Sequence, residues 1–356
     1  GGVQWSGAAE LLTQLVRGLK VPITTTVMAL GVYPSDDPLC LGMLGMHGGY
    51  WTNMAVQDCD ALIAVGARFD DRVTGRTNSF APKAKKIVHI DIDPSSISKN
   101  IKVDVPIVGD IKEVLQVMLA KVKSQEQLAS SQKKWAAWHK QIMDWKQERP
   151  LPYDTQGANG EILPRGIFEE INRLTKGQAI VVTDVGQHQM WAAQMVAFNR
   201  PRSWLTSGGL GTMGYGLPAG IGAHFAAPDR QVVVISGDGS IQMNMQELAC
   251  AVQYQVPVKV VILNNHYLGM VRQWQEKFHE ERYAHSYMEA MPDFVKLAEA
   301  YGAKGFRAEK ASDLSATLQA AFAEPGPVLV ELLIPKSEGV FPMVPAGKAV
   351  HEMLFA

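Results

Sequence analysis

Two short polar segments have residue types that suit a metal ion and a phosphate. Segment 237–240 reads Gly-Asp-Gly-Ser, and Asn264 and Asn265 begin 24 residues after Ser240. An Asp carboxylate and an Asn carbonyl oxygen are hard ligands, which suit a Mg²⁺ ion that keeps other positions for water and phosphate. The glycines let backbone N–H groups approach a diphosphate, and a following helix directs its positive end at the same anion. Asp238 and Asn265 are therefore candidate magnesium ligands.

Two strands and the helix between them must position these segments. Apolar runs at 231–235 and 258–263 predict the strands, and segment 243–254 predicts the helix. Because such a crossover makes the strands parallel and often adjacent, we expect their carboxyl ends ~5 Å apart, at the edge where open α/β sheets bind ligands. Gly-Asp-Gly alone is most often an ordinary turn. Its combination with Asn-Asn at this spacing is far more specific.

Two further segments offer groups to the same ligand. Gln187 and His188 follow a strand predicted at 179–183, where they are candidate donors to phosphate oxygens. A satisfied helix N-cap is the plainer reading of that cluster. Segment 207–216 is half glycine, which permits close backbone approach to a flat ligand, with a flexible loop as the alternative.

The alternation of helical and strand patterns predicts two α/β domains, each a doubly wound, mostly parallel sheet. In the first, helical periodicity and β-branched runs fall at 7–20, 21–25, 61–65, 86–92 and 111–122. In the second, further helices and strands are expected at 162–174, 179–183, 293–301 and 328–333. We assign residues 1–125 to the first domain, 126–160 to a linker and 161–356 to the second domain.

The linker contains a helix with an apolar stripe. Trp135, Trp138, Ile142 and Trp145 fall on one helical face, and packing is a better explanation of them than function. Segment 148–160 is rich in Pro, Gly and Asp, which predicts an extended connection.

Composition excludes several classes of function. Lys and Arg number 34 against 35 for Asp and Glu, so nucleic acid and anionic membranes are not expected partners. Three cysteines without C-x-x-C spacing support neither a disulfide framework nor a zinc site. No apolar run approaches the ~20 residues of a membrane span, and we expect a cytoplasmic protein of bacterial type. The chain begins Gly-Gly-Val without methionine, which predicts a fragment.

The paired segments 237–240 and 264–265 resemble the thiamine-diphosphate signature, in which the Asp, the second Asn and a backbone carbonyl two residues later hold Mg²⁺. That carbonyl is the one of Tyr267. The resemblance extends across the chain to the catalytic large subunit of acetohydroxyacid synthase (acetolactate synthase). It is carried by segments 268–275 (Leu-Gly-Met-Val-Arg-Gln-Trp-Gln), 41–48 and 66–73. It implies an FAD-binding middle domain and a thiamine-diphosphate domain.

Residue roles follow from this resemblance. Met213 would lie under the cofactor and keep its two rings folded together, Trp274 would shape the pocket of the second keto acid, and Arg72 would face the substrate carboxylate. Met270 would also line the substrate pocket. The implied thiamine-diphosphate contacts are Gly186, Gln187, His188, Gly211, Met213, Gly237, Gly239, Ser240, Tyr267, Leu268, Gly269 and Met270. The structural alternative for Trp274 is a place in the core.

The resemblance also implies a flavin site, which in this family is mainly structural. The implied FAD contacts are Gly2, Val27, Met28, Met46, His47, Gly48, Arg68, Asp70, Val73, Asp91, Ile92 and Asp110. Their backbone amides and a guanidinium suit a phosphate. Without the resemblance, the Arg and Asp residues of segment 66–73 would be read equally well as a surface ion-pair network.

The implied activity is decarboxylation of pyruvate and transfer of its two-carbon unit to pyruvate or 2-ketobutyrate, in branched-chain amino acid biosynthesis. Homodimers or homotetramers of full-length subunits and a small regulatory subunit are the implied partners. The family's proton-transferring glutamate lies on an N-terminal domain that is not found here, so no catalytic residue is assigned and the isolated chain is expected to be inactive. A pyruvate oxidase-like enzyme and a noncatalytic cofactor-binding module are the competing interpretations.

Overall fold

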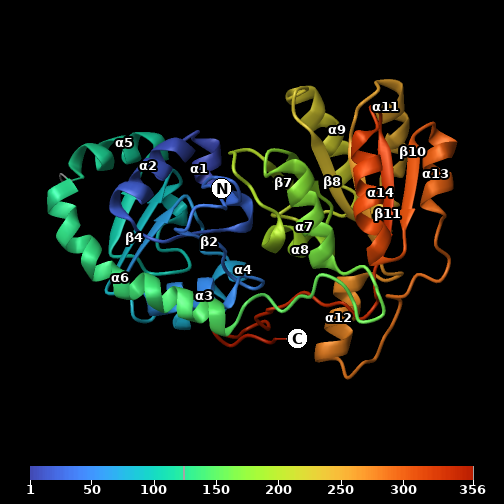
Figure 1. Ribbon diagram of the computed structural model, residues 1–356. Coiled ribbons are helices and arrows are strands. Elements are labelled where there is room, and N and C mark those ends of the chain that lie inside the picture. Colours follow the sequence, from blue (N-terminus) through green and yellow to red (C-terminus); the bar gives the residue numbers. More distant parts are fainter. Residues whose placement is uncertain (123–124, 356) are drawn as a thin grey trace. The chain divides into compact units, whose positions relative to one another are not determined.

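The computed structural model describes residues 1–122 and 125–355, with backbone only for 125–134. Side chains at the start of the predicted linker, 126–134, and Ala356 therefore lie outside the described residues. The chain forms two compact units (Figure 1). Unit 1 comprises Gly1–Pro152, Phe198–Arg202 and Phe341–Ala356, and unit 2 comprises Tyr153–Ala197 and Ser203–Val340.

Unit 1 contains a three-stranded parallel sheet in the order β3-β4-β5 and a separate parallel pair, β1 and β2. Its strands are β1 Ile23–Thr25, β2 Cys40–Met43, β3 Ala61–Val65, β4 Lys86–Asp91 and β5 Val105–Val108. Its helices are α1 Gly2–Trp5, α2 Ala9–Leu19, α3 Tyr50–Asp58, α4 Asp71–Thr74, α5 Ile111–Lys121 and α6 Gln125–Glu148, with 3-10 turns at Val27–Ala29, Thr77–Ser79 and Pro94–Ser96. The expected elements of this unit are confirmed to within about two residues at their ends.

The core of unit 1 forms where the apolar stripe of α2 meets α5 and β4. Leu12, Leu15 and Val16 of α2 are buried with Leu115 of α5 and Ile90 of β4. A stripe repeating every three or four residues forms one helical face, and burial of that face stabilises a helix whose other side is polar.

The tryptophan stripe of α6 packs within unit 1. Ile142 and Trp145 are buried with Trp51 and Ala55 of α3, and Trp138 packs edge-on against Trp145 with ring centroids 5.7 Å apart. The packing interpretation is confirmed for Trp138, Ile142 and Trp145, with α3 as the partner.

The C-terminal segment Phe341–Ala356 belongs to unit 1, whereas the sequence pattern assigned it to the second domain. Val344 N–H donates to the Met46 carbonyl at 2.8 Å, and Asn53 Nδ2 donates to the Val350 carbonyl at 3.1 Å. The segment has no regular periodicity of its own. Backbone pairing with loops far away in sequence decides its place, and local patterns do not reveal such pairing.

Unit 2 contains a six-stranded, all-parallel sheet in the order β10-β11-β9-β8-β6-β7. Its strands are β6 Ile180–Thr183, β7 Trp204–Thr206, β8 Val232–Gly237, β9 Lys259–Asn264, β10 Lys304–Ala308 and β11 Val328–Leu333. Its helices are α7 Pro164–Thr175, α8 Gln187–Met195, α9 Gly216–Ala226, α10 Asp238–Ile241, α11 Leu248–Gln253, α12 Gly269–Phe278, α13 Phe294–Tyr301 and α14 Ala311–Ala323, with a 3-10 turn at Met245–Glu247. The predicted α/β fold class is confirmed.

Strands β8 and β9 are the adjacent parallel pair that the metal site requires. Gly237 lies opposite Leu263, so the two strands end side by side, as expected. Both strands are buried along their whole length, which explains the apolar runs 232–235 and 260–263 within them. The helix expected at 243–254 is interrupted, because it opens as the 3-10 turn and only then becomes α11.

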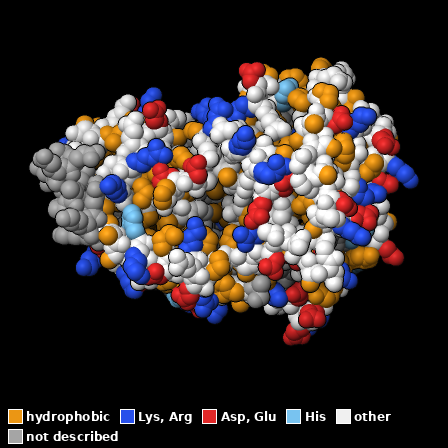
Figure 2. Space-filling view, in the orientation of Figure 1, with side chains coloured by type: hydrophobic (Ala, Val, Ile, Leu, Met, Phe, Trp, Pro, Cys, Tyr) orange, Lys and Arg blue, Asp and Glu red, His pale blue; other side chains and the backbone are white. Residues whose placement is uncertain are grey.

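Surface features agree with the composition. Basic and acidic side chains are interspersed on the visible face of each unit, in keeping with a net charge of -1 (Figure 2). Among the described residues, no helix is both long and apolar enough to span a bilayer.

Lys259 lies at the amino end of β9 and is only 2% exposed. Its ammonium donates to the carbonyl oxygens of Glu324 and Gly326, and burial lowers its pKa from 10.5 to about 8. Between pH 8 and 10.5 the unfolded chain binds the proton that the folded chain releases, so the unfolding free energy contributed by this group rises with pH. From pH 7.5 to 9.5 we expect a rise of about 2 kcal/mol that Lys259→Met abolishes. Urea unfolding of both proteins checks this, and equal pH slopes would contradict it.

Candidate functional site

Asp238 and Asn265 converge at the carboxyl ends of β8 and β9. Asp238 begins α10 directly after β8, and Asn265 follows the last residue of β9. The Asp238 Oδ2 atom accepts a hydrogen bond from the Asn265 backbone N–H at 3.2 Å, and Oδ1 accepts one from Gly239 N–H at 2.8 Å. Both side chains are buried, at 3% and 7% exposure. The convergence that the spacing predicted is therefore present.

Asp238 is a buried carboxylate whose environment favours a cation. Burial raises its pKa to about 6, although the N–H groups of Gly239, His266 and Asn265 oppose this shift. A cation that bound here would remove the cost of keeping this charge away from water. Among the described residues, no group of three or more His, Cys, Asp or Glu side chains could hold a metal. A metal at this site would take one carboxylate, and its other ligands would be amide, backbone, water or phosphate oxygens, as Mg²⁺ prefers.

The turn after Asn265 is held in a defined shape. Asn265 Oδ1 accepts from Tyr267 N–H at 3.0 Å, and His266 has a positive φ of 59°. Segment 286–288 fixes the other side of the turn, since Leu268 N–H donates to the Ser286 carbonyl at 2.8 Å and Met288 N–H to the His266 carbonyl at 2.9 Å. The turn therefore places the backbone of Tyr267 two residues beyond Asn265, in a fixed position.

Gln187 and His188, at the start of α8, lie beside these two segments. Asn265 Nδ2 donates to Gln187 Oε1 at 3.3 Å, and a side chain at Gly237 would meet His188 Nδ1 at 2.8 Å. Burial lowers the pKa of His188 to about 3. Its Nε2 atom is buried without a hydrogen-bond partner among the described residues, which fits a polar ligand at this place.

The helix α12 approaches the same group of residues. A side chain at Gly269 would collide with the Gln187 amide, and one at Gly239 would meet the Leu268 side chain at 2.8 Å. Ser240 Oγ accepts from Gly237 N–H at 3.2 Å and closes the turn at the start of α10. Glycines at positions 239 and 269 therefore let the Leu268 and Gln187 side chains lie directly against the backbone of these turns.

Trp274 and Met270 lie on α12 and are only partly buried. The Trp274 ring packs edge-on against Phe278, with centroids 5.2 Å apart. Both the pocket role and a packing role against Phe278 therefore remain open for Trp274.

The glycine-rich segment 207–216 is tied to the end of β6. Gly214 N–H donates to Asp184 Oδ1 at 2.6 Å, and Gly211 and Gly214 have positive φ values of 69° and 90°. Met213 is partly buried and Gly211 is exposed. Asp184 is a buried residue that holds this loop, and the sequence pattern gave no signal of that role.

Five of the predicted flavin contacts gather at the carboxyl edge of the sheet in unit 1. Gly66, which follows β3, accepts from Gly2 N–H at 3.1 Å, and Asp91, which ends β4, accepts from Gly109 N–H at 3.0 Å. These bonds bring together loops that carry Gly2, Arg68, Asp91, Ile92 and Asp110. Convergence of three strand-end loops favours a ligand site. The Arg68–Asp70 pair, 3.9 Å apart and exposed, also fits the alternative of a surface ion pair.

The remaining flavin candidates lie on neighbouring loops of unit 1. Met28, in the 3-10 turn that begins at Val27, is 40% exposed. His47 is buried, its pKa is lowered to about 4 by burial, and its Nδ1 lies 3.3 Å from the Pro342 carbonyl. Gly48 allows close packing, because a side chain there would meet the Leu44 backbone at 2.7 Å. Val73 is buried in α4.

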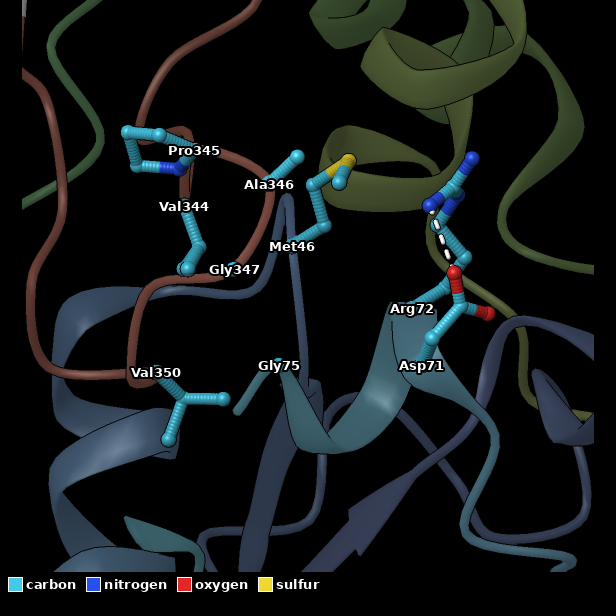
Figure 3. A pocket seen from close by; sticks show the side chains of 9 residues that line it. All are labelled: Met46, Asp71, Arg72, Gly75, Val344, Pro345, Ala346, Gly347 and Val350. Carbon is cyan, nitrogen blue, oxygen red and sulfur yellow. Dashed lines mark hydrogen bonds and ion pairs between the residues drawn. The ribbon is translucent and has the colours of Figure 1, made fainter. Parts of the chain in front are cut away.

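Arg72 lines a small cavity within unit 1 (Figure 3). The cavity has a volume of about 80 Å³, and its lining residues are Met46, Asp71, Arg72, Gly75, Val344, Pro345, Ala346, Gly347 and Val350. The Arg72 guanidinium donates to Asp71 at 2.8 Å and is largely exposed. Arg72 belongs to unit 1, whereas Met270 and Trp274 belong to unit 2.

Comparison with known proteins identifies both units. Residues 184–332 match the family "Thiamine pyrophosphate enzyme, C-terminal TPP binding domain", and residues 1–118 match "Thiamine pyrophosphate enzyme, central domain". Thiamine pyrophosphate is another name for thiamine diphosphate. The fold and the site thus define a thiamine-diphosphate enzyme.

The chain is 45% identical over 357 residues to the acetolactate synthase large subunit of Haemophilus influenzae, covering 100% of this chain and 61% of that protein. It is 46% identical to the isozyme 3 large subunit of Escherichia coli, covering 99% of this chain and 61% of that protein. For the chloroplastic acetolactate synthase 1 of rice the identity is 46%, with 99% and 55% covered. The chain belongs to the acetolactate synthase large-subunit family, and it spans about 60% of the length of these relatives.

Proposed function

We propose that the protein carrying this chain is an acetolactate synthase. It would decarboxylate pyruvate and transfer the two-carbon unit to pyruvate or 2-ketobutyrate, giving 2-acetolactate or 2-aceto-2-hydroxybutyrate for branched-chain amino acid biosynthesis. The observation that carries this proposal is the convergence of Asp238 and Asn265 beside Gln187 and His188, in a chain whose relatives are named acetolactate synthases. The names of these relatives favour the synthase over the pyruvate oxidase-like alternative.

The cofactor supplies a nucleophilic carbon and an electron sink for the decarboxylation. The chain's own residues would bind and orient it. Asp238, Asn265 and the Tyr267 carbonyl would hold Mg²⁺, which would in turn hold the diphosphate. Residues Gly186, Gln187, His188, Gly237, Gly239 and Ser240 would contact the diphosphate, and Gly211, Met213 and residues 268–270 would contact the thiamine rings. Water exclusion and orientation of the acceptor are the further tasks of such a site.

In unit 1 we propose FAD as the ligand of the three strand-end loops. Convergence of these loops at one edge of the sheet supports this proposal, and Arg68 supplies a cation for a phosphate group. We also propose that Arg72 faces the substrate carboxylate. Its exposed guanidinium suits this task, because a planar fork binds a carboxylate through two hydrogen bonds.

The words "large subunit" in the names of the relatives support a smaller, regulatory partner, and we propose homodimers or homotetramers of full-length catalytic subunits in the cytoplasm. We further propose that residues 1–125 and 161–356 are the flavin and thiamine-diphosphate domains, joined by the linker 126–160.

Trp274→Leu tests the proposed acceptor pocket. A smaller side chain removes apolar contact with the larger acceptor, and such a change in a hydrophobic pocket alters discrimination by about 10-fold or more. We therefore expect the preference for 2-ketobutyrate over pyruvate to fall by about 10-fold while 2-acetolactate formation persists. Competition between the two acceptors, with both products quantified, measures this ratio. An unchanged ratio would remove Trp274 from the pocket.

The overall activity is tested by incubating the full-length protein with pyruvate, with and without 2-ketobutyrate, and identifying the products. Full length is specified because the proton-transferring glutamate is expected outside this chain. Acetolactate formation supports the synthase. Bleaching of bound flavin by pyruvate at turnover rates, without acetolactate, would support the oxidase instead.

A further inference from the structure

Glu331 is a buried carboxylate in the middle of an apolar strand. Strand β11 reads Val-Leu-Val-Glu-Leu-Leu, and the Glu331 side chain is 3% exposed between β10 and β9. A buried charge destabilises a fold unless hydrogen-bonded partners compensate for the lost hydration. If stability alone mattered, an apolar residue would suit this position better. The hydrogen-bond partners of Glu331 therefore indicate which role the carboxylate has.

Those partners come from the two neighbouring strands. In the parallel register, Arg307 of β10 lies opposite Glu331, and Ile262 of β9 lies opposite it on the other side. Asn264, two residues after Ile262, projects from the same face, because side chains alternate along a strand. Glu331 Oε2 accepts from Arg307 Nε at 2.6 Å, and Oε1 accepts from Asn264 Nδ2 at 2.6 Å. Both carboxylate oxygens are thereby engaged.

Asn264 connects this carboxylate to the turn that carries the candidate metal ligands. While its amide donates to Glu331, its Oδ1 accepts from His266 N–H at 3.0 Å. His266 is the residue with positive φ between Asn265 and Tyr267. An amide held at both ends in this way fixes the backbone on either side of Asn265.

We propose that Glu331 is a positioning residue that acts through Asn264 to hold the 264–267 turn in the shape required by Mg²⁺. Arg307 holds Glu331 in turn, and its Nη2 is anchored by Asp293 at 2.8 Å. The inference rests on the proposed magnesium site and explains the first asparagine of the Asn-Asn pair, to which no ligand role was assigned. In this proposal the Asn264 side chain links β11 to the metal-binding turn through its two hydrogen bonds.

Metal preference distinguishes this role from a general effect on stability. Mg²⁺ requires nearly ideal octahedral geometry at about 2.1 Å, whereas Ca²⁺ accepts variable geometry at about 2.4 Å. A turn that is no longer held rigidly should lose Mg²⁺ affinity more than Ca²⁺ affinity. A loss of overall stability would lower the affinities for Mg²⁺ and Ca²⁺ by similar factors.

The test compares Glu331→Gln with the unsubstituted protein, both at full length, by titrating Mg²⁺ and, separately, Ca²⁺ in the presence of excess thiamine diphosphate. Binding is followed by calorimetry or tryptophan fluorescence. Replacing a partner that orients a metal ligand typically weakens metal binding by about 10-fold or more, so we expect Mg²⁺ affinity to fall by about 10-fold. The Ca²⁺ affinity should fall less, so that the Mg²⁺/Ca²⁺ preference declines.

Glu170→Gln is the matched control, because Glu170 makes an ion pair with Arg173 on α7 that does not include the metal-binding turn.

The double variant Glu331→Gln with Asn264→Asp conserves net charge and reverses the direction of the hydrogen bond between residues 331 and 264. It should therefore recover much of the Mg²⁺ preference. It also guards against a single variant that simply misfolds. Unchanged Mg²⁺ affinity in Glu331→Gln, or equal losses for Mg²⁺ and Ca²⁺ without recovery, would overturn the proposal. If the full-length protein without substitutions binds neither Mg²⁺ nor thiamine diphosphate, the proposed function itself fails.

Discussion

Asp238→Asn should make the chain more stable without cofactor and, at the same time, abolish its stabilisation by Mg²⁺ and thiamine diphosphate. In the folded chain, burial raises the pKa of Asp238 from 3.8 to about 6. Between these pH values the folded state binds more protons than the unfolded state, so the unfolding free energy falls as pH rises. Above pH 6 the buried charge has its full destabilising effect. Removing the charge should therefore add about 3 kcal/mol to the unfolding free energy at pH 7.5.

The same substitution removes the only carboxylate proposed as a metal ligand, and cofactor affinity should fall by at least about 100-fold. Thermal unfolding with and without Mg²⁺ and thiamine diphosphate measures both effects. Asp229→Asn, at an exposed position of the same unit, is the control and should change neither quantity. Retained stabilisation by the cofactor in Asp238→Asn would show that this carboxylate does not hold the metal.

The second large effect is expected from Gly45→Ala in unit 1. Gly45 has a φ of 99°, which residues with a side chain rarely adopt, and its added Cβ atom would collide with the Arg72 carbonyl oxygen. That carbonyl accepts from Met46 N–H at 2.8 Å and cannot move without breaking this bond. Combined backbone strain and a clash with main chain should destabilise unit 1 by about 4 kcal/mol.

Gly42→Ala is a matched control for Gly45→Ala. Gly42 also has a positive φ, 87°, but no atom lies within 4 Å of the Cβ atom that alanine would add. It should therefore cost about 1 kcal/mol from strain alone. Urea unfolding of both variants checks the difference, and flavin binding to unit 1 should be lost only in Gly45→Ala. Equal losses of unfolding free energy in the two variants would show that the Arg72 carbonyl moves aside easily.

The elements that hold the metal site could be predicted because their signals are local. Strands β8 and β9 have unbroken runs of Val, Ile and Leu, and the polar residues that follow each run mark the strand end. Parallel pairing of consecutive strands then brings Asp238 and Asn265 together without further information.

Other elements gave weaker signals. The sequence of α9, Gly-Leu-Pro-Ala-Gly-Ile-Gly-Ala-His-Phe-Ala, contains three glycines and a proline, and its helix is stabilised by packing against the sheet, which local propensity does not describe. Strand β10 mixes Lys304 and Arg307 with Gly305, so its alternation is obscured. The helix expected at 243–254 begins late because Asn244 bonds the Gly214 carbonyl at 2.7 Å, a contact from a distant loop.

Residues that position the site were the hardest to find. Asp184 and Glu331 act through partners that are 30 and 67 residues away in the chain, so neither has a motif around it. Glu331 did carry one signal, since a single charge inside an apolar strand needs a buried partner. The side chain that provides that partner could be identified only from the register of β9 and β11.

A crystal structure with Mn²⁺ and thiamine diphosphate, analysed by anomalous scattering, tests the central claim most directly. Mn²⁺ replaces Mg²⁺ at oxygen sites and can be located without ambiguity. The predicted result is one anomalous peak within about 2.3 Å of both the Asp238 carboxylate and Asn265 Oδ1, next to the diphosphate. A diphosphate bound elsewhere, or a metal that contacts neither side chain, would contradict the assignment.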